Sequence, residues 1–150
     1  MGTPRLIAAD SDSGQILSTA VRTWLETTYG LRDTGYRQLS ALTAPTNATV
    51  NSWKLRRVGA LVELYYNFQN TSASTVNFTF PAATWLPVGF RPPEQRIFAH
   101  SQNGGNVTGT LAVGTNGVQP YSIVASATDQ ASISWMTNDA WPTTLPGTAV

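Results

Sequence analysis

The sequence predicts an all-β protein, an antiparallel β-sandwich of the jelly-roll kind with a short helix before it. Three observations support this prediction. After Leu31 the apolar residues recur with a period of two, as in half-buried strands. Turn-forming Asn, Gly, Pro and Asp separate these apolar segments, and no later segment has helical spacing. The expected strands are 36–42, 52–58, 60–69, 75–80, 95–99, 107–113, 117–127 and 131–136.

The segment from about 13 to 29 is the exception, because its apolar residues recur with helical spacing. Ile16 and Leu17 are followed by Val21 and then by Trp24. An isolated helix of this length is marginal in water, so it needs a partner surface, either the domain that follows or copies of itself. We therefore expect two parts, a lead-in with a helix over 1–30 and a β domain over 31–150.

Alternation within the strands predicts which side chains face the core. In the strand 60–69 the set Val62, Leu64, Tyr66 and Phe68 is more apolar than its neighbours, so it is expected to point inward. By the same argument, Ile133 and Trp135 share a face of the last strand. Trp85 and Trp141 stand next to prolines in expected loops, which predicts that both are exposed.

Two connections have distinctive sequences. Asn116-Gly117 lies between two apolar segments, and this pair suits a two-residue hairpin turn whose central residues both have positive φ. Segment 85–93 contains three prolines, which fix the backbone and remove amide donors. It cannot be a central strand or a helix interior, so we expect a rigid surface loop suited to contact with a partner.

The composition of the chain excludes several classes of function. Only 11% of the residues are charged, the net charge is +1, and Lys54 is the single lysine. The basic residues form no run, which argues against a nucleic-acid partner. Zero cysteines exclude thiol catalysis and cysteine-ligated zinc, and favour a bacterial or viral source. No window is apolar enough to predict insertion into a membrane.

Catalytic and metal-binding patterns are sparse. His100 is the only histidine, and no Gly-x-Ser-x-Gly motif accompanies it. No spacing typical of zinc or calcium ligands occurs, so no cofactor and no metal are expected. Glu63 and Asp129 could in principle act as the two carboxylates of a glycoside hydrolase, but the sequence cannot place them together. The sequence therefore predicts a protein that is not an enzyme.

Four motifs, taken in order, give a resemblance to a known family. The chain has a Thr-Gly-aromatic start, an arginine-rich strand, a Leu-Pro-x-Gly-Phe-Arg-Pro loop and a Gly-x-Leu-x-Val-x-x-x-Gly hairpin. In this order they resemble the C-terminal head domains of bacteriophage tail fibre and minor tail proteins, over roughly residues 31–134. The segments are Asp33 to Arg37, Trp53 to Gly59, Leu86 to Pro93 and Gly109 to Gly117.

The resemblance implies a β-sandwich head on a homotrimeric stalk, displayed on the virion at the tip of the phage tail. Such heads are attached to other phage tail proteins and adsorb to polysaccharide on the host cell surface. The expected helix would be the trimer neck, with Ile16, Leu17, Val21 and Trp24 packed around the threefold axis. Little sequence precedes this helix, so the chain is expected to be a short tip subunit or part of a longer fibre.

Loop position and composition suggest glycan-binding residues. Aromatic rings pack against sugar rings, while amide, carboxylate and guanidinium groups bind the hydroxyls. The candidates are Trp141 with Asn138 and Asp139, and Gln102 and Asn103 with Arg91. An alternative role for Trp141 is to pin the C-terminal segment to the sandwich.

Two further functions stay open on the sequence. One is a glycan depolymerase, although such enzymes are usually much longer chains with repeats, which this sequence lacks. The other is a cellular lectin-like or adhesin module, which would share the fold but belong to a cell.

Overall fold

A computed structural model describes residues 20–21, 23–24, 32–39, 42–103 and 107–150. The chain divides into two compact units, Met1–Arg32 and Asp33–Val150. The second unit is the β body, which contains all the strands of the described residues.

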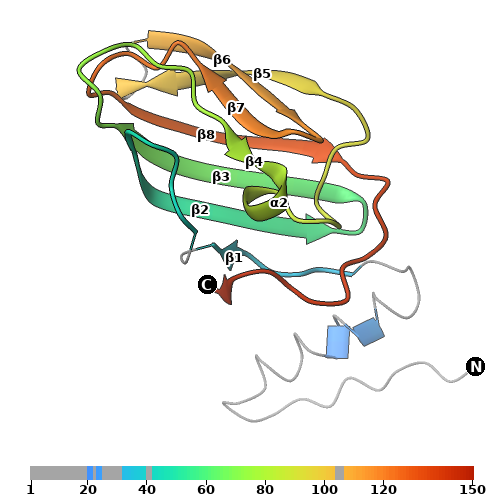
Figure 1. Ribbon diagram of the computed structural model, residues 1–150. Coiled ribbons are helices and arrows are strands. Elements are labelled where there is room, and N and C mark those ends of the chain that lie inside the picture. The colour runs from blue at the N-terminus through green and yellow to red at the C-terminus, as the bar shows by residue number, and fades with distance from the viewer. Residues whose placement is uncertain (1–19, 22, 25–31, 40–41, 104–106) are drawn as a thin grey trace, which may run out of the picture. The chain divides into compact units, whose positions relative to one another are not determined.

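The β body is an antiparallel sheet (Figure 1). In the described residues nine strands pair in the order β4-β7-β6-β5-β8-β3-β2-β1-β9, with the short helix α2 (Ala82–Trp85) after β4. The all-β prediction is confirmed. The strands are β1 (Arg37–Gln38), β2 (Ala48–Val58), β3 (Leu61–Asn70), β4 (Phe80–Pro81), β5 (Arg96–Gln102), β6 (Val107–Gly114), β7 (Gly117–Tyr121), β8 (Thr128–Met136) and β9 (Thr148–Ala149).

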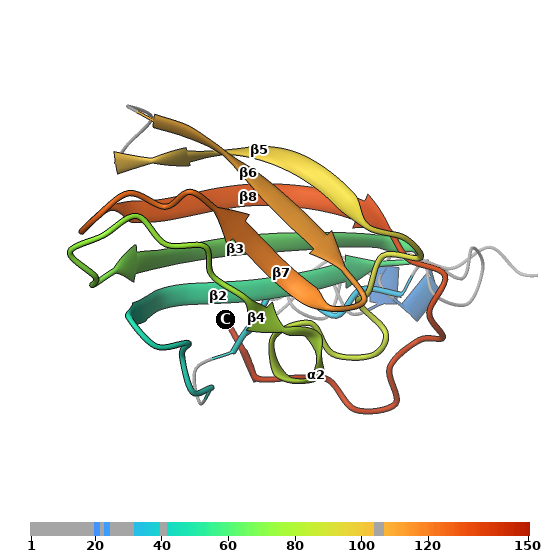
Figure 2. The same cartoon turned by 45° about the horizontal axis from the view of Figure 1, so that its top comes forward.

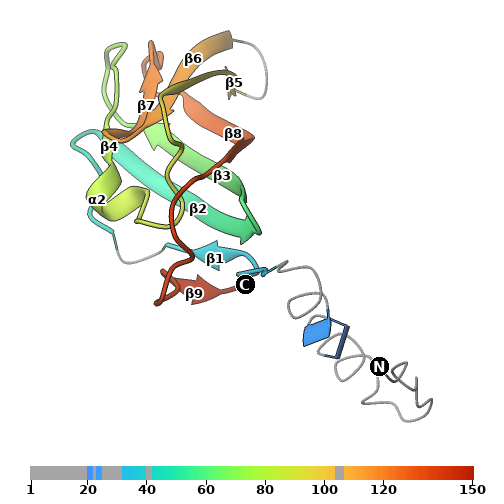
Figure 3. The same ribbon diagram turned by 90° about the vertical axis from the view of Figure 1, so that its right-hand side faces the viewer.

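The sheet curls at the seam between β5 and β8. These two strands pair only at Ser101 with Gln130 and at Gln102 with Asp129, whereas β8 pairs with β3 along its whole length. Because so few bonds hold the seam, the half made of β4, β7, β6 and β5 can fold over the half that contains β8, β3 and β2. Figures 2 and 3 show the two halves facing each other. One continuous sheet thus encloses the core.

Aromatic side chains from both halves fill this core. The ring of Trp53 on β2 lies 4.8 Å from the ring of Phe80 on β4 and 4.8 Å from that of Trp85 on α2. The indole N–H of Trp53 donates to the backbone carbonyl of Trp85 at 3.1 Å, so the buried polar group is satisfied. Trp85 is only 2% exposed. The prediction that it is exposed was wrong, because α2 turns this residue inward before the prolines begin.

The alternation of β3 is confirmed. Val62, Leu64, Tyr66 and Phe68 are all fully buried. On β8, Trp135 is buried and Ile133 packs against the same core, as predicted. The other face of β3 is the outer face of the sheet.

The segment predicted as a strand over 75–80 is mostly irregular. It forms one bridge, between Val76 and Ile123, before β4 begins. Side chains replace the missing backbone pairing here: the carboxamide of Asn70 donates to the carbonyls of Ile123 and Val124, and Asn77 accepts from the N–H of Ser122. β7 likewise ends at Tyr121, whereas the predicted strand continued to residue 127.

The hairpin between β6 and β7 is confirmed, but its turn is shifted by one residue. Thr115 and Asn116 form the loop, and Gly114 pairs with Gly117. Of the predicted pair only Gly117 has positive φ, at 125°. A side chain at Gly117 would also collide with the carbonyl oxygen of Phe80, so the close approach of β4 requires glycine here.

The predicted neck falls largely outside the described residues, since Ile16 and Leu17 are not among them. Val21 and Trp24 have helical backbone and are 48% and 45% exposed. The trimeric neck stays a prediction. Within the described residues, no helix has the length and apolar character needed to span a membrane.

Candidate functional site

Three of the predicted glycan-binding residues come together at the proline-rich loop, namely Arg91, Asp139 and Trp141. Each has a partner within the protein. The carboxylate of Asp139 accepts hydrogen bonds from the backbone N–H groups of Gly89 at 2.9 Å and Arg91 at 3.2 Å. The guanidinium of Arg91 donates to the carbonyls of Leu86 and Ala82. These bonds shape the loop from within, so the groups are largely occupied.

Arg57 completes this arrangement from beneath the loop. Its buried guanidinium donates to the carbonyls of Gly59, Gly89, Asp139 and Ala140. Burial lowers the pKa of Arg57 from its usual value, while the charge of Asp139 acts in the opposite direction. We call Arg57, Asp139 and Trp141, which together hold the loop, the Arg57 clamp.

Trp141 is half-buried rather than fully exposed as predicted. Its ring lies 5.0 Å from the guanidinium carbon of Arg57, in a cation–π contact. The next residue, Pro142, packs against Gly89, where an added side chain would come within 3.0 Å of the proline ring. These contacts favour the alternative role, in which Trp141 pins the C-terminal segment. Asn138 is exposed beside the clamp, and Val88 at the loop tip is 64% exposed.

The other two predicted residues lie at the far end of β5, away from Arg91. Gln102 is fully buried: its amide nitrogen donates to the carbonyl of Ser122, and its amide oxygen accepts from the N–H of Val124. The prediction that Gln102 contacts glycan was wrong, because the side chain supports the turn after β7. Asn103 is exposed, with its side-chain oxygen accepting from the N–H of Thr128.

His100 belongs to a buried cluster at the seam. Its Nδ1 lies 2.5 Å from a carboxylate oxygen of Asp129, and the hydroxyl of Tyr66 donates to the other oxygen at 3.0 Å. Burial, followed by the charge and hydrogen bond of Asp129, raises the pKa of Tyr66 far above its usual value. The side chains of His100 and Asp129 have no exposed surface. The cluster is closed to an external substrate and connects the two halves of the sheet.

The carboxylate pair considered for glycoside hydrolysis is not assembled. Asp129 points into the core, whereas Glu63 lies on the outer face of β3 and pairs with Arg56 at 3.7 Å. A sheet separates the two groups, so they cannot act on one glycosidic bond. Within the described ranges no cluster of three or more metal-ligating side chains occurs.

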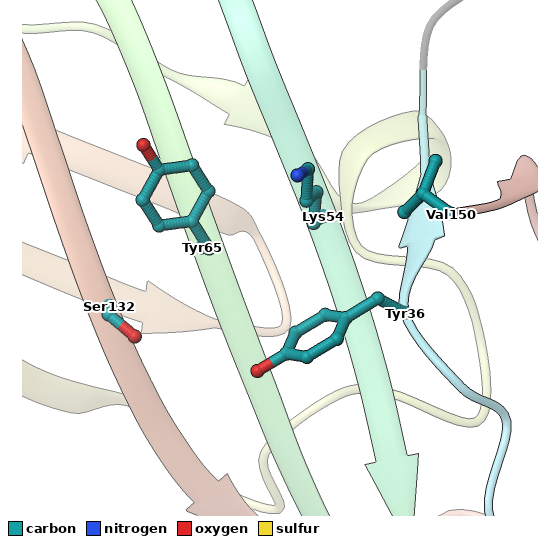
Figure 4. Close-up of a pocket in the computed structure, with 5 residues that line it drawn as sticks. All are labelled: Tyr36, Lys54, Tyr65, Ser132 and Val150. Atoms are coloured by element: carbon teal, nitrogen blue, oxygen red, sulfur yellow. The ribbon is translucent and has the colours of Figure 1, made fainter.

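The outer face of the sheet carries a hollow that the sequence did not single out. Its volume is about 330 Å³, and it opens to solvent over β1, β2, β3 and β8 (Figure 4). Cross-strand register sets its floor, because Lys54, Tyr65 and Ser132 are direct partners on three neighbouring strands. We call this hollow the tyrosine groove; its lining residues are Tyr36, Lys54, Tyr65, Ser132 and Val150.

Tyr36 is fixed by a charged network at the side of the groove. Its hydroxyl donates to Glu63 at 3.0 Å, and its ring lies 5.5 Å from the guanidinium carbon of Arg56. Arg56 in turn forms two hydrogen bonds with Asp33, at 2.9 and 3.2 Å. The hydrogen bond to Glu63 raises the pKa of Tyr36, and the bonds to Asp33 keep the pKa of Arg56 well above its usual value. The ring is therefore held in place before any ligand binds.

Lys54 and Tyr65 form the centre of the groove. The ammonium nitrogen of Lys54 lies 5.9 Å from the ring centre of Tyr65. Among the described residues no carboxylate forms an ion pair with Lys54. Figure 4 shows the ring of Tyr65 to the left of the lysine and the ring of Tyr36 below it.

A row of amides continues the same face along the strands. The carboxamide of Asn51 donates to Asn67 at 2.9 Å, and that of Asn67 donates to Gln130 at 3.3 Å. Asn67 follows Tyr65 by two residues, and Gln130 precedes Ser132 by two. Because side chains alternate between the two faces of a strand, Asn67 and Gln130 point outward with Tyr65 and Ser132. Rings, amides, a hydroxyl and an ammonium group are thus arrayed on a rigid sheet, a combination that suits sugar binding.

Sequence reasoning had one signal for this site. The alternation of β3 already assigned Tyr65 and Asn67 to the outward set, opposite the core residues. It had no means of placing Tyr36 of the β1 segment or Ser132 of β8 beside them.

No family model matches the chain, and no curated protein matches it either.

Proposed function

We propose that the chain is a non-enzymatic component of a bacteriophage tail and that its β body binds polysaccharide on the host cell surface. The tyrosine groove is the observation that carries the binding part of this proposal. Its rings are held by a network of internal bonds and by strand register, so little conformational freedom is lost when a ligand binds. Because the groove is open to solvent, it suits one unit of a long polymer better than a small molecule that needs enclosure.

The assignment to a phage tail depends on the ordered motifs that resemble tail fibre and minor tail proteins. In this proposal the two halves of the curled sheet would serve as the sandwich of such a head, and the helix expected over 13–29 would be its trimeric neck. Three copies would present three grooves to one cell surface, and linked binding of this kind raises the apparent affinity without new contacts.

The test is the binding of the purified chain to a panel of bacterial surface polysaccharides, with Tyr65→Ala as the variant. We expect the wild type to bind at least one polysaccharide and the variant to bind it at least about ten-fold more weakly, as the loss of one stacked ring predicts. Tyr121→Ala is the matched control, because this half-buried tyrosine of β7 lies outside the groove and bonds to Gln119. If no polysaccharide binds, the proposed function is wrong. If Tyr65→Ala binds as tightly as Tyr121→Ala, the tyrosine groove is not the binding site.

A cellular lectin-like or adhesin module would use the same groove, so binding data cannot separate it from a phage protein. Antibody labelling of the chain in electron micrographs does so. Label at the tail tips of virions supports the phage assignment, and label confined to cell surfaces contradicts it.

A further inference from the structure

We infer that the tyrosine groove selects an acidic saccharide unit, with its carboxylate or phosphate group bound by Lys54 and its ring in contact with Tyr36 and Tyr65. This inference deepens the proposed function and depends on it. It concerns the chemical class of the polysaccharide.

Lys54 differs from the other basic residues of the β body. Arg37, Arg57 and Arg91 donate to backbone carbonyls, while Arg56 and Arg96 pair with carboxylates. Arginine suits these roles because its planar fork makes several directed bonds. Lys54 is the only lysine in the sequence, and its ammonium group lies over the Tyr65 ring. The structural cations are therefore arginines, and the one lysine faces the groove.

The nearby charges leave Lys54 as the group able to bind an anion. Arg56 is held between Asp33 and Glu63, so its charge is already compensated. The carboxylate of Glu63 accepts from the hydroxyl of Tyr36 and is drawn toward Arg56. A ligand carboxylate or phosphate between the rings would thus meet an ammonium group with no ion-pair partner in the described part of the chain.

The rest of the groove suits the sugar that carries this anion. The hydroxyl of Ser132 can donate or accept, and the two phenol rings present apolar faces to a sugar ring. An exposed ion pair changes affinity only a few-fold, roughly two- to five-fold. The inference therefore assigns most of the affinity to the rings and the choice of an acidic unit to Lys54.

The test uses the full chain and three oligosaccharide probes of matched length, titrated by calorimetry. One is a hexuronic acid oligomer, the second a hexose phosphate oligomer and the third a neutral hexose oligomer. We expect at least one acidic probe to bind more tightly than the neutral one, with affinity that falls as salt is raised. The two acidic arms distinguish a carboxylate polymer from a phosphate polymer.

Variants assign this preference to Lys54. Lys54→Gln should weaken binding of the acidic probe roughly two- to five-fold and so reduce its advantage over the neutral probe, while Lys54→Arg keeps most of the preference. Arg96→Gln is the control, since it removes an exposed cation on β5 that pairs with Glu94. Thermal unfolding of each variant confirms that it is folded.

Equal binding of acidic and neutral probes, or an unchanged affinity in Lys54→Gln, overturns the inference. If the wild type still binds host polysaccharide and Tyr65→Ala does not, the proposed function survives that failure. If none of the probes and no surface polysaccharide bind, both are wrong.

Discussion

The Arg57 clamp and the tyrosine groove are two polar, aromatic regions of one β body, and they differ in what their side chains contact. In the clamp, Asp139 and Arg57 bond to the backbone of the proline-rich loop. In the groove, Lys54 and Tyr65 point to solvent from regular strands. Polar residues in irregular segments are needed to satisfy backbone groups, whereas the strands satisfy their own backbone and leave outward side chains available. We therefore expect clamp variants to affect stability and groove variants to affect binding.

The largest effect on stability is expected for Arg57→Met. The methionine can fill the space of the stem, but four carbonyl oxygens lose their donor, including those of Gly89 and Asp139. We expect the free energy of unfolding to fall by about 3 kcal/mol, measured by urea denaturation. Arg56→Met is the matched control on the same strand, and its partly exposed ion pairs predict a loss of only about 1 kcal/mol. Equal losses would break the distinction between the two faces of β2.

Asp139→Ala should have the next largest effect. It leaves the N–H groups of Gly89 and Arg91 without their acceptor. The expected loss is about 2 kcal/mol, again from the urea midpoint. Asp139→Asn keeps one side-chain oxygen as an acceptor and should recover most of the stability. A full loss in the asparagine variant would mean that the charge, rather than the hydrogen bonds, holds the loop.

Trp141→Ala should have the smallest effect on stability of the three. The variant loses the cation–π contact with Arg57 and part of a half-buried surface, for which we expect about 1 kcal/mol. Its binding to polysaccharide should equal that of the wild type. A strong loss of binding in a folded Trp141→Ala variant would mean that the polysaccharide binds at the clamp rather than in the groove.

The sequence predicted what depends on local pattern and missed what depends on register. Alternation placed Tyr66 and Phe68 in the core, because a strand with one buried face must alternate. The short pairing of β1 with β9 had no comparable signal, since two residues establish no period. Prolines beside Trp85 suggested a loop, but the preceding turn of helix buries the ring.

The candidate site was missed for a related reason. Gln102 was chosen for its expected loop position and its polar side chain, yet it ends a strand and bonds to the backbone of the turn after β7. Tyr36, Lys54 and Ser132 come from three separate segments, and only strand pairing brings them beside Tyr65. No local feature of the sequence predicts that these side chains lie together.

A chemical-shift titration of the isotope-labelled chain, with a fragment of the polysaccharide that it binds, shows directly whether the tyrosine groove is the binding site. We expect the amide signals of Lys54, Tyr65 and Ser132 to move together, while those of 86–92 and 138–141 stay in place. Shifts confined to the proline-rich loop and to the segment around Trp141 would contradict this expectation.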